Sequence, residues 1–163
     1  MSVEQRLKDL GLVLPKPMDT GHLPFDLVRI DGTHLYLSGH VPTDADGKMS
    51  RALGKVGAEI DPEQANQIAR QVGLGLIASI KASIGNLDRV ASWLRVFGMV
   101  NTAPGFNQLP GVINGCSDLI LEVFGPEVGA HSRSAVGMAE LPFNVPVEIC
   151  LLYTSPSPRD VEE

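Results

Sequence analysis

The chain has 163 residues, of which 44% are hydrophobic and 20% charged, with a formal net charge of −6. This length allows one domain with a real core, and the composition excludes a disordered chain. No apolar run is long enough to span a bilayer, and the scattered basic residues argue against a nucleic-acid partner. Because the N-terminus lacks the apolar core of a signal peptide, we expect a cytoplasmic protein. Two cysteines without CxxC spacing predict neither a zinc site nor a disulfide framework.

The first part of the chain predicts a short helix, a surface arm and a hairpin. Apolar residues recur at helical spacing in residues 3–10, and the proline- and glycine-rich residues 12–24 are typical of an arm on the surface. Residues 26–31 and 34–39 predict a hairpin, and Asp31-Gly32 is expected to supply its tight turn.

A long helix is predicted after this hairpin. Asp61, followed by a proline and a glutamine, has the pattern of a helix start, and Gly85 is typical of a helix end. Gly73 and Gly75 weaken the helix locally, which points to another element approaching closely at these positions.

The second half predicts a strand and a second helix. Residues 90–100 are a strand candidate, in which Trp93 and Phe97, four residues apart, are expected to share a face and to pack. A helix is expected over residues 109–124, ended by Gly125-Pro126.

The stretch HSRSAVGMAELPFNVPVEI predicts two more strands, residues 133–139 and 145–149. If these strands pair antiparallel as a hairpin, Arg133 and Glu148 lie opposite each other on one face. A guanidinium can hold a carboxylate by two hydrogen bonds, and a carboxylate can accept a proton or orient a water. From the pairing alone, the simpler interpretation is an exposed cross-strand ion pair.

This order of strands and helices predicts an α+β fold, with a mixed sheet and two long helices packed on one face. No internal repeat interrupts residues 1–149, which we expect to form a single domain whose first 24 residues are the helix and the arm.

Several motifs in this order resemble the YjgF family, also called the reactive intermediate deaminase (RidA) family. They are PFDLVRIDGTHLYLSGHVP, DPEQANQIARQ, VINGCSDL and the strand pair above, and the resemblance covers roughly residues 20–149. It implies a chorismate-mutase-like fold and a homotrimer with active sites in clefts between subunits. Members studied as enzymes hydrolyse enamines and imines derived from amino acids to a 2-keto acid and ammonia. The N-terminal arm RLKDLGLVLPKP resembles a branch distinct from the best-known deaminases.

The resemblance also implies a site. Arg133 matches the arginine that grips the substrate carboxylate, and Glu148 matches the glutamate that positions the attacking water. Ser38 and Asn114 match pocket residues, and Phe25 stands where the deaminases carry a tyrosine. An imine carbon is already electrophilic, so we expect no metal and no cofactor, only an anchor and a water next to a base.

Three positions depart from the deaminase pattern. Ala135 stands where a Cys or Thr would give one more hydrogen bond to the carboxylate, Phe25 lacks the tyrosine hydroxyl, and Gly75 replaces a common asparagine. We therefore expect a deaminase acting on a small carboxylate-bearing substrate, with a non-catalytic module binding a small carboxylate or ketoacid as the alternative. A third reading, an endoribonuclease or translation inhibitor, is disfavoured by the net charge of −6.

The last residues do not continue the family pattern. The stretch CLLYTSPSPRD matches a translation of a common sequencing-library adapter, as in read-through of an assembled environmental sequence. We therefore expect residues 150–163 to be a tail foreign to the family and partly disordered, although CLLY can extend a strand. His131, next to Ser132, is expected to be a plain loop histidine, because no third group of a triad is evident.

Overall fold

A computed structural model of the chain describes residues 1–156. Three α-helices, two 3-10 turns and five strands follow one another along these residues. Their bounds, in chain order, are α1 (Val3–Asp9), β1 (Val28–Asp31), β2 (His34–His40), α2 (Pro62–Ile84), η1 (Leu87–Arg89), β3 (Ser92–Asn101), α3 (Leu109–Val128), β4 (Ser132–Met138), η2 (Pro142–Asn144) and β5 (Val147–Thr154).

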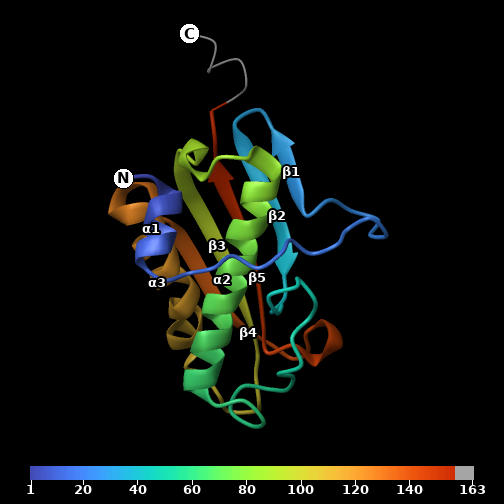
Figure 1. Cartoon of the computed structure of the whole chain (residues 1–163). Coiled ribbons are helices and arrows are strands. Elements are labelled where there is room, and N and C mark those ends of the chain that lie inside the picture. Colours follow the sequence, from blue (N-terminus) through green and yellow to red (C-terminus); the bar gives the residue numbers. More distant parts are fainter. Residues whose placement is uncertain (157–163) are drawn as a thin grey trace.

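The strands form one mixed sheet in the order β1-β2-β5-β3-β4. Only β3 and β4 run parallel, because α3 crosses over the sheet between them. Both long helices lie on the same face, with α2 against β2 and β5 and α3 against β3 and β4 (Figure 1). The predicted α+β architecture is confirmed.

Helix α2 begins and ends where the sequence predicts. The Asp61 side chain accepts a hydrogen bond from the Gln64 N–H, and Gly85 ends the helix with a φ of +79°. Gly73 marks a close approach, since a Cβ there would lie 2.8 Å from a Leu119 methyl carbon of α3. Gly75 does not, because the nearest atom to such a Cβ is the Thr43 hydroxyl at 3.7 Å.

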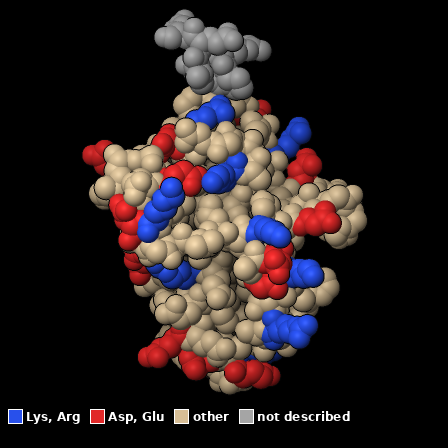
Figure 2. Space-filling view, in the orientation of Figure 1, with Lys and Arg blue, Asp and Glu red and all other residues tan. Residues whose placement is uncertain are grey.

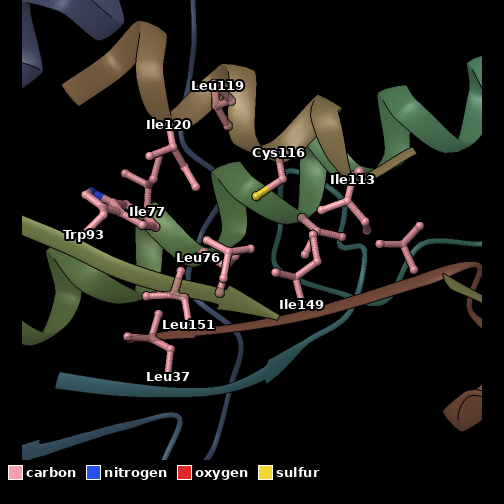
Figure 3. Packing of buried hydrophobic residues seen from close by; sticks show 14 of the residues in the cluster. Leu37, Leu76, Ile77, Trp93, Ile113, Cys116, Leu119, Ile120, Ile149 and Leu151 are labelled. Atoms are coloured by element: carbon pink, nitrogen blue, oxygen red, sulfur yellow. The ribbon is translucent and has the colours of Figure 1, made fainter. Parts of the chain in front are cut away.

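The core lies between the two helices and the sheet. Leu76 and Ile77 of α2 and Ile113, Cys116 and Ile120 of α3 meet strand residues such as Ile149 and Leu151 (Figure 3). The Cys116 thiol belongs to this core, and burial raises its pKa to about 12. A buried thiol of this kind packs like a small apolar side chain, as the sequence predicts.

The predicted hairpin of the last two strands is wrong. Strand β5 pairs antiparallel with both β2 and β3, and β3 separates it from β4. The parallel pairing of β4 with β3 satisfies the β4 backbone on that side instead. The exposed ion pair predicted between Arg133 and Glu148 is therefore wrong as well, because these residues lie on strands that do not touch.

A bulge in β3 changes which residues share a face. Trp93 pairs with Tyr153, but Arg95 pairs with Leu152, so Leu94 is an extra residue in this strand. Trp93 therefore faces the helices and is 1% exposed, while Phe97, paired with Cys150, faces the other side. The expectation that Trp93 and Phe97 share a face is wrong for this reason. The hairpin turn also differs by one residue, since Asp31 pairs with His34 and Gly32-Thr33 form the turn.

Residues 150–154 are the last five of the eight residues of β5. Leu151 and Tyr153 are buried in the core, and the Tyr153 ring lies 6.3 Å from that of Trp93. Ser155 is also buried, at 4% exposure. Residues 157–163, which belong to the tail expected to be partly disordered, lie outside the described residues.

Candidate functional site

Arg133 projects from β4 toward α3. Its register partner on β3 is the fully buried Val96, so the arginine stands on the helix-covered face of the sheet. Its Nη1 donates hydrogen bonds to Asn114 Oδ1 at 2.8 Å and to Ser117 Oγ at 3.1 Å. Asn114 and Ser117 are three residues apart on α3, which places both on one face of that helix. Since β4 is an edge strand, the cluster lies at the rim of the sheet.

These contacts occupy only one nitrogen of the guanidinium. Both Nη1 hydrogens have acceptors, whereas the edge formed by Nε and Nη2 has no partner within residues 1–156. That edge carries two parallel N–H donors, which match the two oxygens of a carboxylate. The Nη1 contacts to α3 therefore hold the Arg133 side chain in place, and its Nε and Nη2 edge can bind an anion.

Glu148 stands on the opposite face of the sheet. Its neighbours Val147 and Ile149 are fully buried beneath the helices, and its register partner is Met99 on the face without helices. The carboxylate lies over Gly39, where a Cβ would be 2.7 Å from Glu148 Oε2. Within the described chain this carboxylate accepts no hydrogen bond and forms no ion pair. Half-burial without a partner raises the pKa of Glu148 above its ordinary value of 4.5.

One chain cannot bring Arg133 and Glu148 to the same small molecule. The register separates them by two strand-to-strand spacings and by three residues along the strands, which places their Cα atoms about 14 Å apart. Their side chains also point to opposite faces of the sheet. A site that used both groups would therefore need two copies of the chain, each supplying one of them.

The remaining predicted residues are linked to Arg133 or to Glu148 by contacts or by neighbouring positions in the chain. Asn114 contacts Arg133 directly, and Ala135 shares its face on β4, packed against the core. On the other side, Ser38 precedes Gly39, and its hydroxyl donates to the Asp26 carbonyl at 2.7 Å. Phe25, next to Asp26, is 52% exposed. We call Arg133, Asn114 and Ala135 the arginine half-site, and Glu148, Ser38 and Phe25 the glutamate half-site.

The structure adds three residues that sequence reasoning missed. Gly39 leaves the space that the Glu148 carboxylate occupies, and a glycine directly after the candidate Ser38 was the available signal. Ser117 follows Asn114 by one helical turn, which would have placed it beside the same ligand. His131 lies in a loop, as expected, and its ring is hydrogen-bonded to Ser117 at 2.9 Å.

Glu148→Gln is expected to raise the melting temperature at pH 8, with a gap to the wild type that closes toward pH 4. The raised pKa means that the folded protein keeps this proton to higher pH than the unfolded chain, so stability falls as pH rises from about 4.5 through the folded pKa. Thermal unfolding between pH 4 and pH 8 measures the gap. Burial lowers the pKa of His40, and both proteins keep His40, so its own pH dependence cancels. Exposed Glu127 serves as the control position; identical melting temperatures at pH 8 would contradict the prediction.

Comparison with known proteins shows the family of this chain. The family model described as "YjgF/chorismate mutase-like, putative endoribonuclease" matches residues 4–156. The chain belongs to this family. Protein TCP17 of Trypanosoma cruzi is 38% identical over 148 residues, which cover 90% of each chain.

Two solved structures of the family's fold are also similar. Protein Atu1372 of Agrobacterium tumefaciens, of unknown function, has a TM-score of 0.84 and 36% identity, covering 94% of this chain and 92% of its own. A Shewanella oneidensis protein described as a "putative endoribonuclease" has a TM-score of 0.87 and 29% identity. The match covers 94% of this chain and 99% of that protein. The YjgF-family fold is therefore established for nearly the whole chain.

Two further properties of the described residues bear on function. None of the helices in residues 1–156 has the length and apolar character needed to cross a membrane. In the same residues, no three His, Cys, Asp or Glu side chains come together in a way that could hold a metal ion.

Proposed function

We propose that this YjgF-family protein hydrolyses imines and enamines derived from amino acids, in a site that two subunits complete. The observation that carries the proposal is the pair of half-sites. An arginine with a vacant two-donor edge and a carboxylate without a partner lie on opposite faces of one chain. Neither group is used up by the fold, and together they are the anchor and the base that imine hydrolysis needs.

In the proposed reaction, the Nε and Nη2 edge of Arg133 holds the substrate carboxylate. Glu148 of a neighbouring subunit accepts a proton from a water as its oxygen bonds to the imine carbon, and the imine nitrogen takes up a proton. In the resulting adduct, Glu148 passes the proton that it took from the water to the amino group. The carbon–nitrogen bond then breaks, ammonia leaves, and the hydroxyl releases its proton to solvent as it becomes the carbonyl of the 2-keto acid. The raised pKa of Glu148 makes it a stronger base than an ordinary glutamate once it is ionised.

The sheet face without helices supports assembly into the homotrimer that the family resemblance implies. Its residues are largely apolar but are only partly buried in the single chain: Phe97, Met99, Val136 and Leu152. A face of this kind is best covered by another protein surface. A trimer that packs through this face brings a neighbour's residues toward Glu148.

Two other functions are less well supported. A non-catalytic module that senses a small carboxylate fits Ala135 and Phe25, which remove a hydrogen-bond donor and a hydroxyl from the deaminase pattern. Binding of a carboxylate alone, however, gives no role to the Glu148 carboxylate. For RNA cleavage, a basic surface would be needed, and on the face in Figure 2 lysine and arginine are interspersed with aspartate and glutamate.

Arg133→Ala is expected to lower kcat/KM for an enamine substrate about 100-fold, because a carboxylate loses a bidentate, charge-assisted partner. The enamine is generated in situ by a threonine-dehydratase-type enzyme, and release of ammonia and 2-keto acid is measured. Arg70→Ala, which removes an arginine of α2 paired with Glu122, is the matched control. Its activity is expected to stay at the wild-type level.

The oligomeric mass of each protein is measured by light scattering in the same experiment. No acceleration by folded, trimeric wild-type protein over several substrate side chains would overturn the deaminase proposal. Binding of a 2-keto acid without hydrolysis would then favour the sensing module.

A further inference from the structure

Behind the arginine half-site lies a serine–histidine pair that the proposed reaction does not use. The Ser117 hydroxyl of α3 and His131 Nε2 are 2.9 Å apart, and His131 Nδ1 lies 2.7 Å from the Gly129 carbonyl. Ser117 is 8% exposed and also receives a hydrogen bond from Arg133. The chain of contacts thus runs from the backbone before β4, through the imidazole and the hydroxyl, to the guanidinium.

When the His131 ring is neutral, the acceptors in this chain of contacts fix the direction of every hydrogen bond. A carbonyl can only accept, so His131 Nδ1 carries a hydrogen, and the neutral ring has its lone pair on Nε2. The Ser117 hydroxyl must then donate to Nε2. A guanidinium nitrogen can only donate, so the remaining lone pairs of Ser117 Oγ accept from Arg133 Nη1.

The hydroxyl would face Arg133 differently without the histidine. A serine hydroxyl rotates freely, and one that pointed its hydrogen at Nη1 would repel the guanidinium. By taking that hydrogen, His131 keeps the Ser117 lone pairs turned toward Arg133. Together with Asn114, this holds both Nη1 hydrogens and leaves the Nε and Nη2 edge facing outward.

We propose that Ser117 and His131 are positioning residues that orient Arg133 for a carboxylate, and so restrict the site to imines of amino acids over imines of simple amines. The inference rests on the proposed function, in which Arg133 holds the substrate carboxylate, and adds the residues that orient Arg133. Neither residue touches the substrate in this arrangement. Their effect is confined to the binding of the carboxylate.

A second serine–histidine pair in the chain supplies a matched comparison. His40 Nε2 lies 2.8 Å from the Ser79 hydroxyl of α2, and His40 Nδ1 lies 2.7 Å from the Ser38 carbonyl, two residues before it. His131 has the same relation to the carbonyl of Gly129. Ser79 and His40 contact no arginine among the described residues, so they carry the structural role of such a pair without the positioning role.

The test compares two imines with the same side chain. One carries a carboxylate, 2-iminobutyrate from a dehydratase, and one lacks it, the imine of propanal from an amine oxidase. Ser117→Ala and His131→Leu are expected to raise KM for the first imine about 10-fold and leave its kcat within about 2-fold, since one hydrogen bond to a charged group is lost. The kinetics of the second imine should not change. His131→Gln, whose amide oxygen can accept from Ser117, should restore the wild-type KM.

Several outcomes would overturn the inference. If Ser117→Ala left KM unchanged, or raised KM equally for both imines, the pair would be a purely structural feature. The same conclusion would follow if folded His131→Gln did not restore the wild-type KM. Ser79→Ala controls for the loss of a buried serine–histidine bond, and the ratio of its two KM values should stay at the wild-type value. Thermal unfolding of each variant shows that it is folded.

A binding measurement separates this inference from the proposed function. Calorimetric titration with 2-ketobutyrate measures the affinity of the Arg133 site for a carboxylate, even if no hydrolysis occurs. Wild-type binding without hydrolysis, weakened about 10-fold by Ser117→Ala, would refute the deaminase and support the positioning pair. Neither hydrolysis of the imine nor binding of 2-ketobutyrate by the folded wild type would refute both.

Discussion

Two inactive variants, Arg133→Ala and Glu148→Gln, are expected to recover activity when their subunits are mixed. Each variant alone lacks one half of every site, and removal of the base is expected to lower kcat about 10²–10⁴-fold. In a mixed assembly, some interfaces combine the intact arginine half-site of one subunit with the intact glutamate half-site of its neighbour. If equal amounts assemble at random, about a quarter of the sites are intact.

A second mixture makes this measurement decisive. Wild type mixed equally with the Arg133→Ala/Glu148→Gln double variant should also retain about a quarter of the sites when sites lie between subunits. If each site lay within one chain, the first mixture would stay inactive and the second would keep about half. The two mixtures are prepared by refolding from denaturant, and their rates are compared at equal protein concentration. No activity in the first mixture together with about half of the wild-type activity in the second would refute the intersubunit site, whichever reaction the protein catalyses.

Gly115→Ala is expected to destabilise the fold by about 3 kcal/mol. A Cβ at Gly115 would overlap the main-chain oxygen of Asn66 on α2, and a main-chain atom cannot swing aside as a flexible side chain can. The two helices would have to separate, and the packing between them would be lost. For a domain of this size, the melting temperature should fall by about 6–12 °C.

Gly111→Ala on the same helix is the matched control. A Cβ at Gly111 would meet nothing within 4 Å, so the change only removes backbone freedom and should leave stability equal or slightly higher. Chemical denaturation of both variants and the wild type gives the comparison. Equal stability of the two variants would show that α2 and α3 can separate at little cost at this crossing.

The sequence predicted the helices well because their ends are encoded locally. Asp61 caps α2 by a hydrogen bond to a residue three positions away, and Gly85, which ends α2, adopts the positive φ that glycine favours. A signal of this kind requires only neighbouring residues. The same holds for the first hairpin, whose turn includes Gly32. The end expected at Gly125-Pro126 is wrong, because Gly125 only kinks α3, which continues to Val128.

Strand pairing could not be read in the same way. The prediction joined β4 to β5 because they are neighbours in sequence, but β3 lies between them and α3 must cross the sheet before β4. That arrangement depends on which helix surface covers which strand, a property of distant residues. The bulge at Leu94 is equally non-local, because only the pairing with β5 reveals it.

Family resemblance points to the two candidate residues, whereas the predicted pairing of their strands is wrong. Arg133 and Glu148 were expected to face each other, and the structure places them on opposite faces. The contact between Ser117 and His131 could not be predicted, because it joins α3 to the segment before β4. Sequence spacing alone gives no sign of such a contact.

The central position of β5 has a consequence for how the chain acquires its structure. This strand is the last of the five to be synthesised, yet it pairs on both sides, joining β2 to β3. While the chain is being made, β1 with β2 and β3 with β4 can form only separate pieces, each with an unpaired backbone edge. Such edges readily join other chains, so the nascent protein is most prone to aggregate until its final strand emerges.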